Sequence, residues 1–81
     1  MKTLYEVVGQ AISDTQFQCR PCVCDSLETA QLYIEKRFKA IDNAGLMPYS
    51  LTAIRTTYRR NRDFVYWVEE IDLIEKDDIN S

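Results

Sequence analysis

The first stretch of the chain alternates between two sets of side chains in the manner of a β-strand. Residues 4–12, LYEVVGQAI, are rich in the β-branched and aromatic types that favour strands. Both sets contain apolar residues, so the pattern leaves open which face of this strand is buried. The polar cluster SDT at 13–15 is typical of a turn, and residues 16–23 complete a predicted hairpin. Pro21 lacks a backbone N–H, so we expect the second strand at a sheet edge or bent there.

The next stretch has helical periodicity, with apolar residues recurring every three or four positions. These positions are Leu27, Ala30, Ile34, Phe38 and Ile41. They form one apolar stripe and predict an amphipathic helix over about residues 26–43. Asp25, followed three residues later by Glu28, has the spacing of a capping box at the start of a helix. Gly45 is typical of a residue that ends one.

The C-terminal half predicts a second hairpin. Residues 51–58, LTAIRTTY, have the composition of a strand, and the polar RRNRD at 59–63 is typical of a turn. Residues 64–74, FVYWVEEIDLI, form the most strongly β-favouring stretch of the chain. We therefore predict an α+β fold of order β-β-α-β-β, an antiparallel sheet of about four strands with one amphipathic helix packed on one face. Residues 1–75 form one compact domain in this prediction, and 76–81 a polar, frayed tail.

Length and composition limit the classes of protein that this chain can be. At 81 residues there is room for one domain. The longest apolar run, FVYWV at 64–68, is five residues, whereas a membrane-spanning helix needs about 20. The N-terminal residues lack the apolar stretch of a signal peptide, so we expect a cytoplasmic protein and no membrane partner. The formal net charge is −3, which disfavours direct nucleic-acid binding because phosphate contacts need a basic excess.

Three cysteines lie within six positions, CRPCVC: Cys19, Cys22 and Cys24. A structural zinc site takes four Cys or His ligands, and this chain has no histidine and no second cysteine cluster. A thiol redox pair would need Cys19 and Cys22 at a helix N-terminus, but the predicted helix starts after Asp25. We therefore expect the cysteines to be small apolar strand residues, with a metal or redox module as an alternative.

Two oppositely charged segments follow one another in the C-terminal hairpin. The basic one contains Arg55, Arg59, Arg60 and Arg62, with the aromatic Tyr58 between them. The acidic one, residues 69–78, has six acids against one lysine, and its predicted partner-binding members are Glu69, Glu70, Asp72 and Glu75. Each segment has a plain interpretation as a solvated surface that keeps the protein soluble. Together they favour a charge-polarised surface that steers and orients a protein partner.

The sequence lacks the residues of common catalytic sites. Without histidine, the most frequent general base and the Ser-His and Cys-His pairs are missing. Glu69 and Glu70 are adjacent and face opposite sides of a strand, so they cannot flank one bond as a hydrolase pair does. Two glycines are too few for a phosphate-cradling loop. We expect a non-enzymatic protein without a cofactor.

The leading hypothesis is a small acidic protein-binding module. In size, acidity and compactness the chain resembles the small inhibitors that phages and other mobile elements encode, the anti-CRISPR proteins among them. This resemblance in format implies a nucleic-acid-handling complex as the partner, inhibited by charge mimicry in a basic groove. The alternative is RNA or single-stranded DNA binding through the Arg-rich hairpin. A homodimer stays open, because Leu46, Met47 and Tyr49 would form an apolar patch if they were exposed together.

Overall fold

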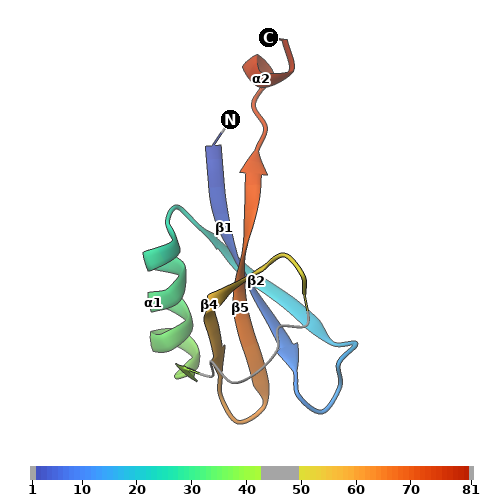
Figure 1. Ribbon diagram of the computed structural model, residues 1–81, viewed down its shortest axis with the longest axis vertical. Helices are drawn as coiled ribbons and strands as arrows, with labels where there is room; N and C mark the ends of the chain where they lie inside the picture. Colours follow the sequence, from blue (N-terminus) through green and yellow to red (C-terminus); the bar gives the residue numbers. More distant parts are fainter. Residues whose placement is uncertain (1, 43–49, 81) are drawn as a thin grey trace.

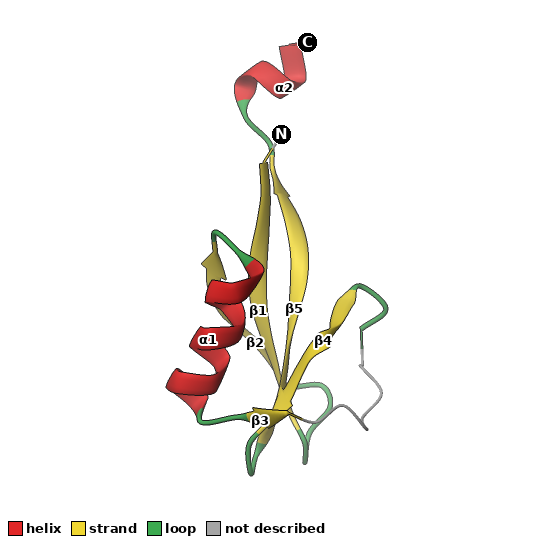
Figure 2. Ribbon diagram, turned by 60° about the vertical axis from the view of Figure 1, so that its left-hand side comes forward, coloured by secondary structure: helices red, strands yellow, loops and turns green. Residues whose placement is uncertain are grey.

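The computed structural model describes residues 2–42 and 50–80. Its elements are β1 (Lys2–Ala11), β2 (Gln18–Cys24), α1 (Leu27–Phe38), β3 (Ile41–Asp42), β4 (Ala53–Arg60), β5 (Phe64–Leu73) and α2 (Lys76–Asn80). The strands form one antiparallel sheet of order β2-β1-β5-β4-β3, and α1 lies across one of its faces (Figure 1, Figure 2). The predicted α+β class is confirmed. The sheet has five strands instead of about four, because a two-residue β3 pairs with the end of β4.

The centre of the sheet is formed by the first and last strands of the chain. β1 and β5 pair over ten positions, from Lys2 opposite Leu73 to Ala11 opposite Phe64. β2 lies outside β1 at one edge of the sheet. The edge position predicted from Pro21 is therefore confirmed, since a proline there leaves no ladder hydrogen bond unmade.

Helix α1 is shorter than its periodicity predicts, and its cap is one residue later. Ser26 is the N-cap, and its hydroxyl accepts a hydrogen bond from the backbone N–H of Thr29, so the predicted box of Asp25 and Glu28 is wrong. The helix ends at Phe38 because Lys39 takes a left-handed conformation, with φ of 51°. The predicted extension to residue 43 is therefore wrong. The predicted terminator Gly45 lies outside the described residues.

The apolar stripe of α1 packs on the sheet as expected. Ala30 and Ile34 are fully buried against Val7 and Val68, and the ring of Phe38 stacks on that of Tyr66 at a centroid distance of 4.4 Å. The last predicted member of the stripe does not belong to it. Ile41 lies in β3 and is 71% exposed, because the left-handed turn at residue 39 redirects the chain into the sheet.

The opposite face of the sheet holds a second buried cluster, formed by Val8, Tyr58, Val65 and Trp67. Both faces of β1 are therefore buried, which explains why its sequence pattern was ambiguous. An irregularity in β4 supplies part of this cluster, since residues 55–58 stand opposite Trp67 alone. There a side chain replaces the backbone as the hydrogen-bonding partner of β5. The Thr57 hydroxyl accepts a hydrogen bond from the backbone N–H of Val68 at 2.9 Å and donates one to the carbonyl of Ile54 at 2.6 Å.

β1 and β5 continue beyond their neighbours as a two-stranded ribbon. The last pair that β2 makes is Cys24 with Tyr5, and the first that β4 makes is Ala53 with Glu69. Residues 2–4 therefore pair only with 71–73, and Glu70 pairs only with Tyr5; Figures 1 and 2 show this end of the two strands projecting from the rest of the sheet. The radius of gyration is 13.6 Å, against about 12 Å for a compact chain of this length.

The predicted frayed tail is helical in the structure. Lys76–Asn80 form α2 at the end of the ribbon, where the Asp78 carboxylate accepts a hydrogen bond from the backbone N–H of Glu75. No helix within the described residues is long and apolar enough to cross a membrane.

Candidate functional site

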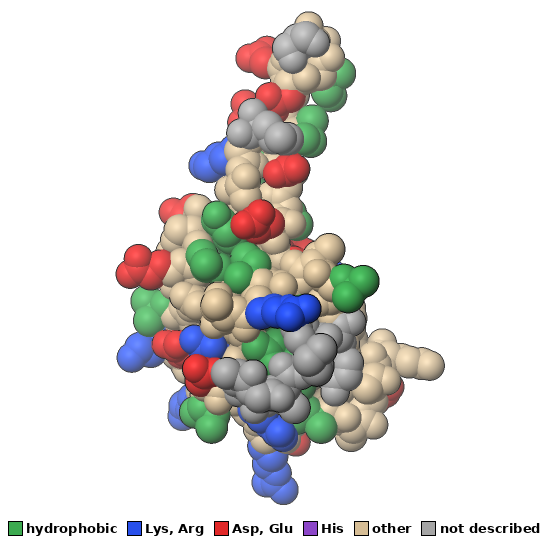
Figure 3. Space-filling view, viewed as in Figure 1, with side chains coloured by type: hydrophobic (Ala, Val, Ile, Leu, Met, Phe, Trp, Pro, Cys, Tyr) green, Lys and Arg blue, Asp and Glu red, His purple; other side chains and the backbone are tan. Residues whose placement is uncertain are grey.

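Charge is unevenly distributed along the long axis of the molecule, whose principal extents are 45 × 25 × 20 Å. In Figure 3 acidic side chains outnumber a basic one on the projecting end, which carries the ribbon and α2, whereas most lysine and arginine side chains lie on the rest of the body, beside further acids. The eight predicted binding residues therefore do not form one surface. They fall into an internally bonded group, an acidic group on the ribbon and a basic group at the far end.

Glu69 belongs to the interior network of the sheet. Its carboxylate accepts hydrogen bonds from Trp67 Nε1 at 2.7 Å and from Thr52 Oγ1 at 2.8 Å, and Arg20 lies 3.9 Å away. Burial alone would raise the pKa of this carboxyl, but the hydrogen bonds and Arg20 outweigh burial and hold it below its usual value. The Glu69 carboxylate is therefore already bonded to other residues of the fold, and little of it is left to bind a partner.

The guanidinium group of Arg59 is also bonded to other residues of the fold. Its guanidinium group donates to the backbone carbonyls of Thr56 and Tyr58, both at 3.1 Å. It also lies 3.4 Å from a Glu35 carboxylate oxygen on α1 and 3.7 Å from one of Asp42 on β3. Arg59 therefore closes the irregular part of β4 and ties it to two neighbouring elements.

The remaining acids are exposed along the ribbon and at its end. Glu70 and Asp72 stand opposite Tyr5 and Thr3, on the face of the sheet that carries α1. Glu75 follows between β5 and α2 and is exposed. These three are the predicted acidic residues that the structure leaves available to a partner.

The other face of the ribbon is mainly apolar, with Lys2 beside Leu73 at its outer end. Leu4 stands opposite Ile71, and the next alternate position of β5 is Leu73. These residues share the face of Val8 and Trp67, so the second core cluster continues outward as an apolar stripe. Leu73 is 41% exposed and the following Ile74 is 53% exposed. We call residues 2–4 and 70–73, with their acidic and apolar faces, the acidic ribbon.

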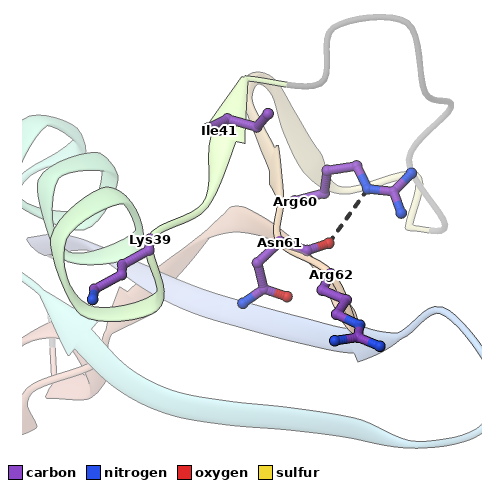
Figure 4. Close-up of a pocket in the computed structure, with 5 residues that line it drawn as sticks. All are labelled: Lys39, Ile41, Arg60, Asn61 and Arg62. Carbon is purple, nitrogen blue, oxygen red and sulfur yellow. Dashed lines mark hydrogen bonds between the residues drawn. The ribbon is translucent and has the colours of Figure 1, made fainter.

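The basic group includes a shallow hollow of about 330 Å³. Its described lining residues are Lys39, Ile41, Arg60, Asn61 and Arg62, which come from the end of α1, from β3, from the end of β4 and from the β4–β5 turn. Figure 4 shows the guanidinium groups of Arg60 and Arg62 on one side of Ile41 and the ammonium group of Lys39 on the other. We call this site the basic hollow: an apolar floor with a cationic rim.

Asn61 lines the basic hollow, and its side chain forms hydrogen bonds within the fold. Its side-chain amide donates to the carbonyl of Phe38 and to the hydroxyl of Tyr66. Its side-chain oxygen accepts from the backbone N–H groups of Asp63 and Phe64. Asn61 thereby fixes the β4–β5 turn against the end of α1, which sets the position of the two arginines beside it.

The aromatic residue of the basic segment is buried, so it cannot stack on a base as the nucleic-acid alternative would require. Tyr58 is 1% exposed and stacks on Trp67 at a centroid distance of 6.0 Å, so it is not available to a nucleotide. Arg55 is exposed in the irregular part of β4, apart from the lining of the basic hollow. Of the predicted basic residues, only Arg60 and Arg62 share one site.

All three cysteines face α1. Cys24, Cys22 and Cys19 stand opposite Tyr5, Val7 and Gly9 respectively. Between the last two of these pairs, residues 20–21 of β2 stand opposite Val8 alone, and this bulge restores Cys19 to the same face. Simple strand alternation, which separates Cys19 from the other two, is therefore wrong here.

All three thiols are free, and those of Cys22 and Cys24 pack in the apolar core. Cys24 is buried in the helix-side cluster, and Cys22 packs against it with its sulfur 3.8 Å from that of Cys24. Burial first, and then the hydrogen bond and charge of Cys24, raise the pKa of the Cys22 thiol to about 11. Such a thiol is a poor nucleophile. In the described parts of the chain, no three His, Cys, Asp or Glu side chains are placed to hold a metal ion.

Sequence reasoning missed the residues that complete these surfaces. The predicted helix over residues 26–43 includes Lys39 and Ile41, yet these two line the basic hollow. The sequence predicts Leu4 in a strand, but its position on a projecting ribbon depends on the pairing of β1 with β5. Nothing in the sequence around Lys39 indicates that this residue takes a left-handed conformation. No protein-family model matches the chain, and comparisons with curated proteins and with solved structures find no match.

Proposed function

We propose that this protein is a non-enzymatic module that binds another protein through its acidic ribbon. The observation that carries the proposal is the extension of β1 and β5 beyond their neighbours, with acids on one face and an apolar stripe on the other. A two-stranded ribbon gains little stability by itself in water. Its unpaired edges also invite unwanted strand pairing. A partner that covers the ribbon accounts for both features.

The two faces of the acidic ribbon specify the partner's chemistry. Glu70 and Asp72 are alternate residues of one strand, about 7 Å apart along it, and they can each meet a separate lysine or arginine. Leu4, Ile71 and Leu73 require an apolar wall on the other side. The partner is therefore expected to present a groove with one basic and one apolar wall.

A nucleic-acid-binding groove has the charge that this surface needs. Proteins that bind nucleic acid carry basic surfaces that contact phosphate groups. An acidic ribbon in such a groove occupies it by charge mimicry, so we propose inhibition of a nucleic-acid-handling complex as the biological role. The acidic, single-domain format shared with phage and mobile-element inhibitors agrees with this role. We expect it to act in the cytoplasm, where the three cysteines stay reduced.

Charge reversal on the ribbon tests the proposal. The ribbon variant carries Glu70→Lys and Asp72→Lys; Glu69 is left intact because its bonds to Trp67 and Thr52 hold the fold together. The matched control reverses two exposed acids elsewhere, Asp25→Lys and Asp63→Lys. Each tagged protein is used to capture partners from the native host, and each is checked for an unchanged thermal midpoint.

We expect wild type and the control variant to capture one partner that the ribbon variant loses. Heparin, a soluble polyanion, should elute that partner, because it competes for the same basic groove. A ribbon variant that retains the partner at the wild-type yield would contradict the proposal. So would a partner that heparin leaves bound, since the contact would then not depend on a basic groove.

A second pair of variants tests the apolar face. Ile71→Thr keeps a β-branched residue in the strand and removes apolar surface, whereas Ile71→Val keeps the surface apolar. We expect capture to fall at least fivefold for Ile71→Thr and to stay near the wild-type yield for Ile71→Val. Equal yields from the two variants would show that the partner contacts only the acidic face.

A further inference from the structure

The basic hollow exposes an apolar side chain that the fold does not use. Ile41 is 71% exposed on the two-residue strand β3. Around it, Lys39 and Arg62 form no ion pair with another described residue. An apolar floor with a cationic rim fits an apolar side chain that is flanked by carboxylates.

The opposite end of the same molecule presents such a segment. Ile79 on α2 is 73% exposed, and Ile74 just before α2 is 53% exposed. The exposed acids Glu75 and Asp77 lie between them in the sequence. With three acids against Lys76, residues 74–79 carry a net charge of −2, opposite in sign to the basic hollow, and their exposed isoleucines match its apolar floor.

We infer that the basic hollow receives α2 of a second copy of this chain. The contact cannot form within one molecule, because α2 and the hollow lie at opposite ends of a body 45 Å long (Figure 1). It joins two different surfaces, so after one contact the first copy still has a free α2 and the second still has a free hollow. Copies therefore associate head to tail, as open chains or as a ring if the rotation closes.

The expected association is weak and depends on salt. One five-residue helix covers far less than the roughly 800 Å² per partner of a stable interface. Ion pairs at an exposed rim are screened as ionic strength rises. We expect self-association at about 1 mM protein in low salt, and its loss in 0.5 M sodium chloride.

Two charge-reversed variants test the pairing of these two surfaces. The hollow variant carries Lys39→Glu and Arg62→Glu, and the helix variant carries Glu75→Lys and Asp77→Lys. Each variant alone presents like charges at both ends, so each should be monomeric by sedimentation velocity where wild type associates. An equimolar mixture restores opposite charges in both contacts, because the reversed hollow meets the reversed helix. We expect this mixture to associate at least as strongly as wild type.

Three results would overturn the inference. Wild type could remain monomeric at 1 mM in low salt, the mixture could fail to regain association, or Ile79→Ser could associate as wild type does. Binding of a labelled single-stranded RNA that is lost in the hollow variant, without any self-association, would instead assign the hollow to nucleic acid. The inference is independent of the acidic ribbon, since Glu70 and Asp72 are unchanged in every variant.

Discussion

Glu6 of β1 and Glu69 of β5 stand directly opposite each other on adjacent strands. Like charges in this position repel each other. Arg20 of β2 relieves the repulsion, with one guanidinium nitrogen 2.7 Å from Glu6 and another 3.9 Å from Glu69. The arginine between the cysteines therefore holds three adjacent strands together at the point where the ribbon leaves the sheet.

The first prediction concerns acid stability. The folded-state pKa of Glu69 lies below its ordinary value of 4.5, so the unfolded chain binds a proton first as the pH falls. The stabilising contribution is present above pH 4.5 and is lost as the pH falls through the folded pKa. Glu69→Gln should therefore lower the free energy of unfolding at pH 7 and weaken its decrease between about pH 5 and pH 3.

Urea denaturation at a series of pH values measures this effect. Glu70→Gln, on the same strand but exposed, is the matched control and should stay within about 0.5 kcal/mol of wild type at pH 7. An acid dependence that Glu69→Gln leaves unchanged would show that the bonds of Glu69 do not stabilise the folded state.

The second prediction separates two arginines of β4. Arg59→Ala leaves the carbonyls of Thr56 and Tyr58 without this donor and should lower the free energy of unfolding by about 1–3 kcal/mol. Arg55→Ala changes an exposed position and should cost less than about 0.5 kcal/mol. Equal midpoints in urea for the two variants would contradict the structural role given to Arg59.

The third prediction concerns the hydroxyl of Thr57. Thr57→Val keeps the side-chain shape but leaves the Val68 N–H and the Ile54 carbonyl without their partner. We expect a loss of about 1–3 kcal/mol in the free energy of unfolding, and faster hydrogen exchange at the Val68 amide. Thr57→Ser keeps the hydroxyl, so its Val68 amide should exchange at close to the wild-type rate. Slow exchange in Thr57→Val would mean that another group protects this amide.

The fourth prediction uses the close contact at Gly9. A β-carbon there would lie 2.8 Å from Tyr66 Cε1 and 2.9 Å from Cys19 Sγ. Gly9→Ala should therefore cost about 1–3 kcal/mol of stability. Cys19→Ala removes one of the two obstacles, so the double variant should be more stable than the sum of the single effects by at least about 0.5 kcal/mol. If the stability changes of the two single variants added exactly in the double variant, the Cys19 sulfur would not be in contact with residue 9.

The fifth prediction concerns the Cys22 thiol, whose pKa is raised from 9.0 to about 11. Its thiolate fraction at pH 8 is then about 100-fold lower than in the unfolded chain, one factor of ten for each pH unit. Alkylation by iodoacetamide, followed by peptide mass spectrometry, should be at least that much slower than in 8 M urea. Its rate should keep rising with pH above 9. Alkylation of Cys22 at the unfolded rate would contradict its burial.

Local interactions explain which parts of the fold the sequence predicts. The stripe of Ala30, Ile34 and Phe38 identified the helix and the face that it buries, because residues three and four apart share one side of a helix. Pro21 identified an edge strand through its missing N–H. The limits of the helix were less well predicted: a cap at Ser26 and a left-handed Lys39 depend on how the chain meets the sheet.

The candidate sites depend on pairings between distant parts of the chain. Glu69 and Glu70 are neighbours in a run of acids, yet the pleat of β5 directs one into a bonded network and leaves the other exposed. Arg59 and Arg60 are separated in the same way, because the irregularity of β4 uses Arg59 to satisfy its own carbonyls. The two members of each pair have the same charge and adjacent positions in the sequence. Only the register of the strands shows which of them is bonded within the fold and which is exposed.

The sequence by itself determined the α+β class, the order of the two hairpins and the helix, and the opposite charges of two adjoining segments. These follow from periodicity and composition, which are local properties of a chain. The tertiary structure alone decided that β1 pairs with β5, that this pair projects as a ribbon, and that Lys39 and Ile41 join Arg60 and Arg62 in one hollow. The physical reason is that residues far apart in the sequence come together only when strands pair and faces pack.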